Sequence, residues 1–182
     1  MKIVETGFEG LYVIEPVVFK DERGYFFESF NKTRFSSAGI EFSPIQDNES
    51  RSSKGVVRGL HYQLNPAAQA KLIRVVAGAI LDVAVDLRKA SPTFGKWFAI
   101  ELDEEGKRQL FIPRGFAHGF SVLSDYTVIQ YKCDNLYNPK LERGINPFDS
   151  TLAIDWRTAH ENAVVSAKDK AAAGFKDAEV NF

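Results

Sequence analysis

The sequence is poor in cysteine, in net charge and in long apolar runs, and each absence excludes a class of protein. Cys133 is the single cysteine among 182 residues, so no intramolecular disulfide can form, and a reducing cytoplasm is expected rather than secretion. The formal net charge of -1 provides no general attraction to nucleic acid or to an acidic membrane surface. Residues 1–16 include Glu5 and Glu9 and have no continuous apolar run, which is not the pattern of a signal peptide. We therefore expect a cytoplasmic protein with no nucleic-acid partner and no membrane partner.

Several catalytic signatures are also missing. The chain contains no G-x-S-x-G nucleophile motif, no P-loop and no glycine-rich dinucleotide loop. Its three histidines form no H-x-H or H-E-x-x-H pair, and Gln63 stands where a second metal ligand after His61 could stand. Three-ligand sites need His or carboxylate side chains at matched positions, so we expect no metal site.

The composition is that of one globular domain spanning residues 1–182. Hydrophobic residues make up 45% of the chain and charged residues 26%, close to the usual globular mixture. Fifteen phenylalanines contribute to an aromatic content of 13%, and the aromatics lie in short segments rather than at helical spacing. This pattern favours β structure.

Closely spaced turn signals predict many short strands. The apolar segments around residues 21–24 predict a hairpin, and further hairpins are expected to turn near residues 104–107 and at residues 124–125. Residues 71–88 read as two strands joined at Ala77 and Gly78. Asn31 and Ser166 are candidate N-caps of short helices near the two ends of the chain, and residues 137–149 read as an ordered loop. The expected fold class is all-β, an antiparallel sandwich or barrel.

Four ionisable side chains share strand faces with apolar neighbours: His61, Lys71, His118 and Tyr131. Each alone is more often a satisfied core residue or, for the lysine, a side chain that reaches water along an apolar surface. Burying all four in solid packing would be costly, whereas polar residues that converge inside a barrel form a ligand cavity. The residues alone therefore favour a site inside the barrel. In residues 81–88 the apolar side chains alternate with polar ones, which places Asp82 on the outward face.

Several longer motifs make the chain resemble the dTDP-4-dehydrorhamnose 3,5-epimerases. They are DERGYFFESF, QDNESRS, GVVRGLHYQ, AKLIRVVAGAILDVAVDLR, SPTFGKW, FIPRGFAHGF and YKCDNLYNP, and the similarity runs over essentially the whole chain. The resemblance implies a cupin double-stranded β-helix, or jelly roll, with a few short helices. It also implies a homodimer without metal or organic cofactor, acting on a dTDP-4-keto-6-deoxy sugar.

The resemblance also implies the chemistry. A 4-keto sugar has acidified C–H bonds at C3 and C5, so a base can leave an enolate and reprotonation from the other face inverts the carbon. His61 is similar in position to the base, Asp169 to the carboxylate that orients it, and Tyr131 to the acid on the opposite face. Lys71 is similar to the lysine that stabilises the enolate oxygen.

The family pattern carries over to a larger set of substrate-binding positions. These are Arg23, Phe26, Glu28, Gln46, Asn48, Arg58, His118, Tyr137, Glu142 and Lys168. The hairpin at residues 21–24 is expected to reach the site of a neighbouring subunit. Strict alternation points Arg58 away from His61, so a bend or bulge at Gly59 is required if both face the pocket. Asp82 is a candidate partner of His118, although its predicted face is outward.

Alternatives stay open from the sequence. A relative that inverts only C3 or only C5 could use the same residues. A cupin that binds a nucleotide sugar without turning it over, or a metal-dependent cupin oxygenase, belongs to another functional class. The combination of His61, Lys71, Tyr131 and Asp169 speaks against binding alone.

Overall fold

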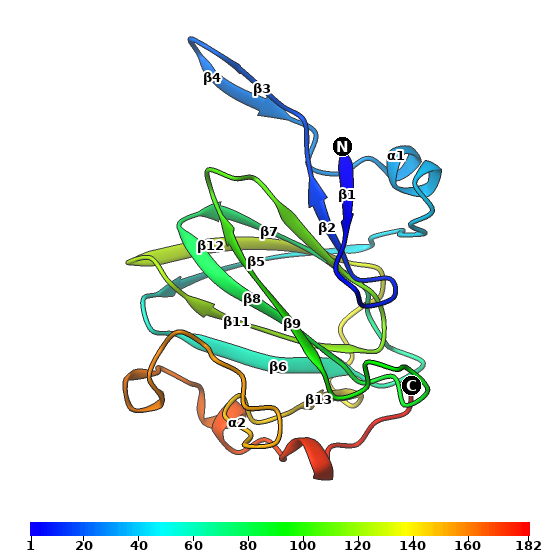
Figure 1. The fold of residues 1–182 in the computed structure, drawn as a ribbon, viewed down its shortest axis with the longest axis vertical. Helices are drawn as coiled ribbons and strands as arrows, with labels where there is room; N and C mark the ends of the chain where they lie inside the picture. Colours follow the sequence, from blue (N-terminus) through cyan, green and yellow to red (C-terminus); the bar gives the residue numbers. More distant parts are fainter.

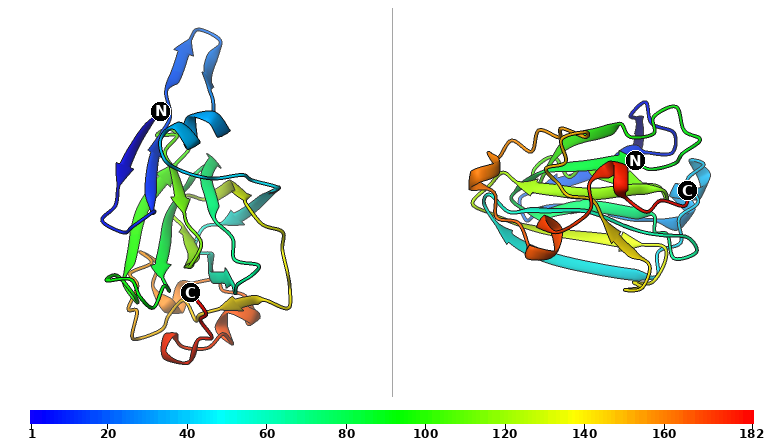
Figure 2. Two further views of the ribbon diagram at one scale, coloured as in Figure 1. Left: turned by 90° about the vertical axis from the view of Figure 1, so that its right-hand side faces the viewer. Right: turned by 90° about the horizontal axis from the view of Figure 1, so that it is seen from below.

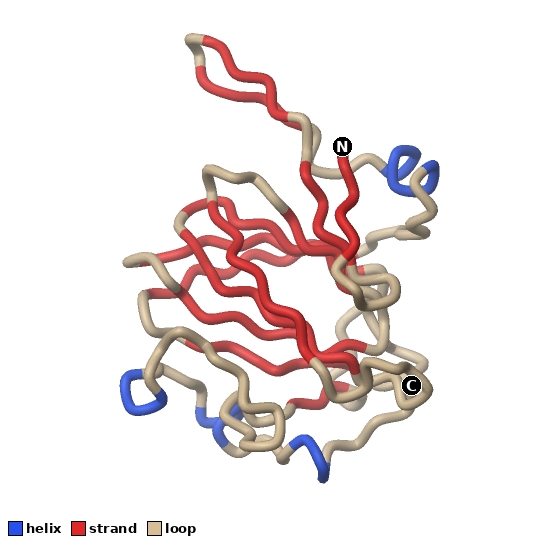
Figure 3. The backbone as a smooth tube through the Cα atoms, in the orientation of Figure 1, coloured by secondary structure: helices blue, strands red, loops and turns tan.

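Two antiparallel sheets face each other in the computed structural model, which describes residues 1–182 (Figure 1). The first sheet has the strand order β1 (Lys2–Glu5), β2 (Tyr12–Glu15), β10 (Gln109–Ile112), β7 (Lys71–Ala77), β12 (Tyr126–Cys133) and β5 (Gln46–Ser53). The second has the order β13 (Glu142–Gly144), β6 (Val57–Gln63), β11 (Phe116–Val122), β8 (Ala79–Asp86) and β9 (Trp97–Asp103). A separate hairpin, β3 (Val18–Asp21) and β4 (Gly24–Phe27), projects from the body of the molecule (Figures 1 and 3). The expected all-β jelly roll is confirmed.

From β9 to β13, each strand is followed in the chain by a strand of the other sheet. β9 pairs with β8 while β10 pairs with β2 and β7, and β11 pairs with β6 and β8 while β12 pairs with β5 and β7. The hairpins predicted to turn near residues 104–107 and 124–125 are therefore wrong. A turn signal marks where a strand ends, but it does not tell whether the next strand returns beside it or enters the facing sheet. The first predicted hairpin does form, with Asp21 opposite Gly24.

The apolar side chains form an inner core between the sheets, an outer core on the outer face of the β6–β11–β8 sheet, and a smaller third cluster that includes Phe35 and Phe111. The inner core includes Ile80 and Ala84, whereas Leu81 and Val83 belong to the outer core. The segment that follows β13 lies against the outer face of this sheet (Figures 1 and 2). Its Trp156 belongs to the outer core. Because both faces of β8 are buried, the apolar face of residues 81–88 is not the interior one. The prediction that Asp82 points outward is wrong for this reason.

A bulge at Gly59 changes the direction of side chains along β6. His61 lies opposite His118 and Arg58 lies opposite Phe120, so two residues of β6 face the single residue between them on β11. Gly59 has φ of +117°, and a Cβ there would lie 2.6 Å from Cα of Gly119. Val57 consequently joins the outer core, contrary to the predicted face shared with His61. The required bend exists, and it allows Arg58 to approach the pocket side.

Short helices begin at the predicted caps. Asn31 Oδ1 accepts a hydrogen bond from the Arg34 amide at 3.1 Å and starts α1 (Lys32–Ser37). Ser166 Oγ accepts one from the Asp169 amide at 3.0 Å and starts α2 (Ala167–Lys170). Two 3-10 turns, η1 (His160–Asn162) and η2 (Phe175–Asp177), also lie near the C-terminus, and β13 interrupts the predicted loop at 137–149. None of these helices has the length and apolar character needed to cross a membrane.

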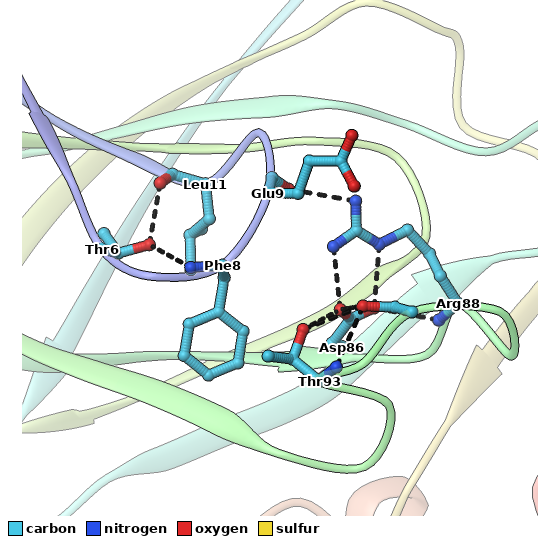
Figure 4. A network of polar contacts seen from close by, with 8 residues as sticks. Thr6, Phe8, Glu9, Leu11, Asp86, Arg88 and Thr93 are labelled. Carbon is cyan, nitrogen blue, oxygen red and sulfur yellow. Dashed lines mark hydrogen bonds and ion pairs between the residues drawn. The ribbon is translucent and has the colours of Figure 1, made fainter.

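A partly buried network ties the loop between β1 and β2 to the end of β8 (Figure 4). Arg88 donates to Asp86 through Nε at 2.9 Å and Nη2 at 2.8 Å, and to the Glu9 carbonyl at 3.0 Å. Ser91 and Thr93 donate their hydroxyl groups to the same carboxylate at 2.7 and 2.6 Å. Burial pushes the pKa of Asp86 upward, but these hydrogen bonds outweigh it and lower the pKa to about 2.

Candidate active site

A pocket of about 310 Å³ brings together side chains from both sheets and from two loops. Its lining residues are Gln46, Asn48, His61, Tyr62, Gln63, Gln69, Lys71, Tyr131, Tyr137 and Glu142. All but Tyr62, Gln63 and Gln69 belong to the site predicted from the sequence. The pocket is in the size range of small-molecule sites, and its lining is mainly polar.

His61 and Asp169 form an ion pair or hydrogen-bonded pair at the pocket wall. His61 Nε2 lies 2.7 Å from Asp169 Oδ1, which leaves Nδ1 as the ring nitrogen without a protein partner. Burial raises the pKa of Asp169, but the His61 contact, the Gly59 amide and the Ser166 hydroxyl outweigh it and lower the pKa below its usual value. The carboxylate is therefore ionised at neutral pH and fixes the orientation of the imidazole.

Lys71 enters the pocket at the beginning of β7 and makes no salt bridge. Burial lowers the pKa of its ammonium group, and the nearby Cys133, Asp82 and Glu142 oppose that shift. A half-buried ammonium group without a directly bound carboxylate, in the lining of a pocket, is suited to stabilising negative charge that develops on a ligand.

Tyr131 lies on β12, and its strand pairs with both β5 and β7. Burial raises the pKa of the phenol, and Arg58 opposes the rise. The phenol is therefore protonated at neutral pH and can donate a proton. Arg58 itself donates from Nε to Ser52 Oγ at 3.0 Å and lies beside the pocket rather than in its lining.

A second histidine–carboxylate pair lies behind the first. His118 is directly opposite His61 on the neighbouring strand, and its Nε2 is 2.5 Å from Asp82 Oδ1. His118 is 7% exposed, Asp82 is fully buried, and Asp82 Oδ2 has no hydrogen-bond partner. The proposed pairing of these two residues therefore forms, but His118 is not part of the pocket lining.

The pocket rim is held by a network around Glu142. Glu142 Oε2 accepts from Tyr137 Oη at 2.7 Å and from Lys168 Nζ at 2.5 Å. Burial raises the pKa of Glu142, but these two donors outweigh it and lower the pKa. Gln46 accepts from the Tyr137 amide at 2.9 Å and donates to Asn48 at 3.0 Å. Lys168 directly precedes Asp169 on α2, so one short helix contributes to both the rim and the His61 pair.

The remaining predicted residues lie on or beside the projecting hairpin, away from the pocket (Figure 1). Arg23 pairs with Asp21 at the hairpin tip, and Phe26 is 69% exposed. Glu28 accepts from Asn31 Nδ2 at 2.6 Å. Within one chain these three side chains are therefore not brought to the site.

The sequence prediction did not include three of the lining residues. Tyr62 follows His61 and belongs to the outer core, and its hydroxyl donates to the Glu179 carbonyl at 2.8 Å. Gln63 shares the face of His61 by strand alternation, and this pattern could have predicted that it faces the pocket. Gln69 lies in a loop, where no periodicity could indicate its direction. No group of three His, Cys, Asp or Glu side chains is arranged to hold a metal ion.

Comparison with known proteins gives a consistent set of relatives. Residues 5–177 match the family model described as dTDP-4-dehydrorhamnose 3,5-epimerase. The chain is 51% identical over 180 residues to the dTDP-4-dehydrorhamnose 3,5-epimerase of Shigella flexneri, covering 98% of both chains. The crystal structure of the epimerase from Elizabethkingia anophelis has a TM-score of 0.93 at 50% identity and 97% coverage of both chains. That of a Legionella pneumophila 3,5-epimerase in complex with dTDP-4-keto-L-rhamnose has a TM-score of 0.92 at 47% identity, covering 97% of this chain and 93% of that one.

Proposed function

The chain belongs to the dTDP-4-dehydrorhamnose 3,5-epimerase family, and from that premise we propose that its barrel pocket performs the family reaction with the residues named below. The enzyme epimerises C3 and C5 of dTDP-4-dehydro-6-deoxyglucose to give dTDP-4-dehydrorhamnose. The observation that carries the assignment of the site is the presence of His61, Lys71 and Tyr131 in one pocket, with Asp169 bonded to the first.

The proposed chemistry needs only proton transfers. Nδ1 of His61 removes the proton from the carbon next to the ketone, and the C–H electron pair forms the enolate. The Lys71 ammonium group stabilises the enolate oxygen. The Tyr131 O–H then donates a proton to the opposite face of the same carbon, so that the carbon is inverted and the ketone restored. The tyrosinate and the imidazolium return to their starting states by exchange with water, and the sequence is repeated at the second carbon.

We assign the nucleotide carrier to the rim of the pocket. Tyr137 is 54% exposed, and its ring is available for stacking on a base. Lys168 and Arg58 are the cations beside the rim that suit diphosphate oxygens, and Gln46 and Asn48 supply amide groups. If the diphosphate binds to Lys168, the ammonium group of Lys168 must contact both the diphosphate and the Glu142 carboxylate.

We further propose that the active form is a homodimer in which the β3–β4 hairpin reaches the pocket of the other subunit. The hairpin carries Phe19, Tyr25 and Phe26 with exposures of 63%, 56% and 69%, and an isolated two-stranded hairpin is only marginally stable in water. A second subunit would cover these rings and add Arg23 and Phe26 to the carrier site. The single free thiol, Cys133, supports a reducing cytoplasmic location.

Proton exchange provides the experiment that tests the function. The protein is incubated with dTDP-4-keto-6-deoxyglucose in D₂O, and deuterium at each carbon is followed by NMR. Double epimerisation predicts label at both C3 and C5, whereas label at one carbon would indicate a single-position epimerase. An absence of label at both carbons would contradict the proposed chemistry. Loss of exchange after EDTA treatment would favour a metal-dependent mechanism.

A further inference from the structure

The side-chain amide of Gln63 hydrogen-bonds to the backbone of two loops. Its Nε2 donates to the Ala67 carbonyl at 2.7 Å and to the Leu136 carbonyl at 3.2 Å. Its Oε1 accepts from the Asn138 amide at 2.6 Å. The side chain is 5% exposed, and both amide protons are used, so the group has no donor left for a ligand.

Both loops border the pocket, through Gln69 and Tyr137. Residues 64–70 lead directly into Lys71, and residues 134–141 carry Tyr137 and lead into Glu142. Gln63 lies two residues after His61 on the same strand face, so a single side chain connects the strand of the base to both loops. Glu142 is also the register partner of Gln63 in the β13–β6 pair.

Other amides join the same loops farther from His61. Gln69 Nε2 donates to the Asn135 carbonyl at 2.7 Å, and Asn135 Nδ2 donates to the Pro66 carbonyl at 3.2 Å. These contacts link loop to loop, whereas the side chain of Gln63 hydrogen-bonds to both loops from β6. Gln63 is therefore placed to couple the rim to the strand that carries the base.

We propose that Gln63 is a positioning residue that fixes the position of the carrier-binding rim relative to His61. This inference rests on the proposed function of the pocket. It acts through the loop backbone and not by contact with the reacting carbon. Removing its amide leaves the buried Ala67 carbonyl, the more exposed Leu136 carbonyl and the Asn138 amide N–H without these partners, so the loops must shift or hydrate. The substrate should then bind more weakly, while bound substrate that reaches the base should still react.

The test uses Gln63→Met, which keeps the length and volume of the side chain but removes its hydrogen bonds. We expect KM for the sugar nucleotide and Kd for dTDP to rise by about tenfold or more, which corresponds to roughly 1.4 kcal/mol, while kcat stays within about threefold. Hydrogen–deuterium exchange should accelerate at the Asn138 amide and in residues 64–70 and 134–141. Exchange in the β3–β4 hairpin should not change.

Gln130→Met is the matched control, because Gln130 contacts Arg74 and Glu49 and is not part of the pocket lining. It should leave Kd for dTDP unchanged. If Gln63→Met does not fold, Gln63→Glu serves instead, since it keeps an acceptor for Asn138 but loses both donors, and Kd for dTDP should again rise.

Two outcomes would overturn the inference: unchanged KM and Kd despite faster loop exchange, or a fall in kcat equal to the fall in kcat/KM. Absence of deuterium uptake by the wild-type enzyme would contradict the proposed function, whereas the dTDP titration would still test the role of Gln63.

Discussion

His61 and His118 lie directly opposite each other on β6 and β11, and each ring contacts its own carboxylate through Nε2. Only the His61 ring lines the pocket, because His118 is 7% exposed and lies behind it. Two chemically similar pairs are therefore placed differently: one at the ligand surface and one inside the barrel. This difference decides which pair can reach a substrate proton.

Replacement of the base should abolish exchange at both carbons. His61→Asn removes the only proposed base, and we expect deuterium incorporation at C3 and at C5 to fall together, by about 10² to 10⁴. The measurement is the NMR assay in D₂O, with dTDP binding as the control for folding. Exchange retained at one carbon would require a second base there.

Tyr131→Phe should separate proton removal from inversion. The base and the lysine remain, so the substrate still exchanges its protons, but the acid on the opposite face is lost. We expect deuterium in recovered substrate with a lower yield of inverted product. Wild-type product formation would show that Tyr131 serves only in packing.

Lys71→Met should lower kcat by about 10² to 10³, as expected for loss of one preorganised charge at a developing oxyanion. Its ammonium form is the active one, and burial lowers its pKa from the ordinary value of 10.5. Activity of the wild type should therefore fall, as pH rises, at a pH below 10.5. A rate profile that is flat up to the usual lysine range would contradict this role.

Asp86→Asn should remove a part of the acid-dependent stability. The carboxyl has a pKa of about 2 in the folded chain against an ordinary value of 3.8, so its contribution of about 2 kcal/mol is fully present above pH 3.8. It is lost as pH falls through the folded pKa. Urea unfolding at a series of pH values should show a smaller loss of stability between pH 4 and about 2 in the variant than in the wild type.

Subunit complementation tests the proposed hairpin exchange. Arg23→Ala and His61→Asn should each be poorly active alone. In a mixed dimer, the pocket with an intact His61 receives the hairpin with an intact Arg23, so activity should recover after the two are unfolded and refolded together. If Arg23 served its own chain, the mixture would gain nothing over the sum of the separate proteins.

The sequence predicted the side-chain faces of Lys71, His118 and Tyr131, because their strands have one interior face with regular alternation. It failed at β8, where a C-terminal segment covers the outer face and makes both faces apolar. It also could not predict the sheet partners of β9 and β11, since pairing is decided by contacts far away in the chain. The pairing of His61 with Asp169 rested on family resemblance, because no local pattern relates the two residues.

His61 and Asp169 are separated by 108 positions, so the base has its carboxylate only when β6 and α2 are both in place. Catalysis is thus a stringent reporter of the whole native topology. During refolding, strand content measured by circular dichroism should recover before turnover does, since contacts between distant parts of a chain form slowly. A preparation with normal β structure but a loose C-terminal segment would be inactive without having lost its barrel.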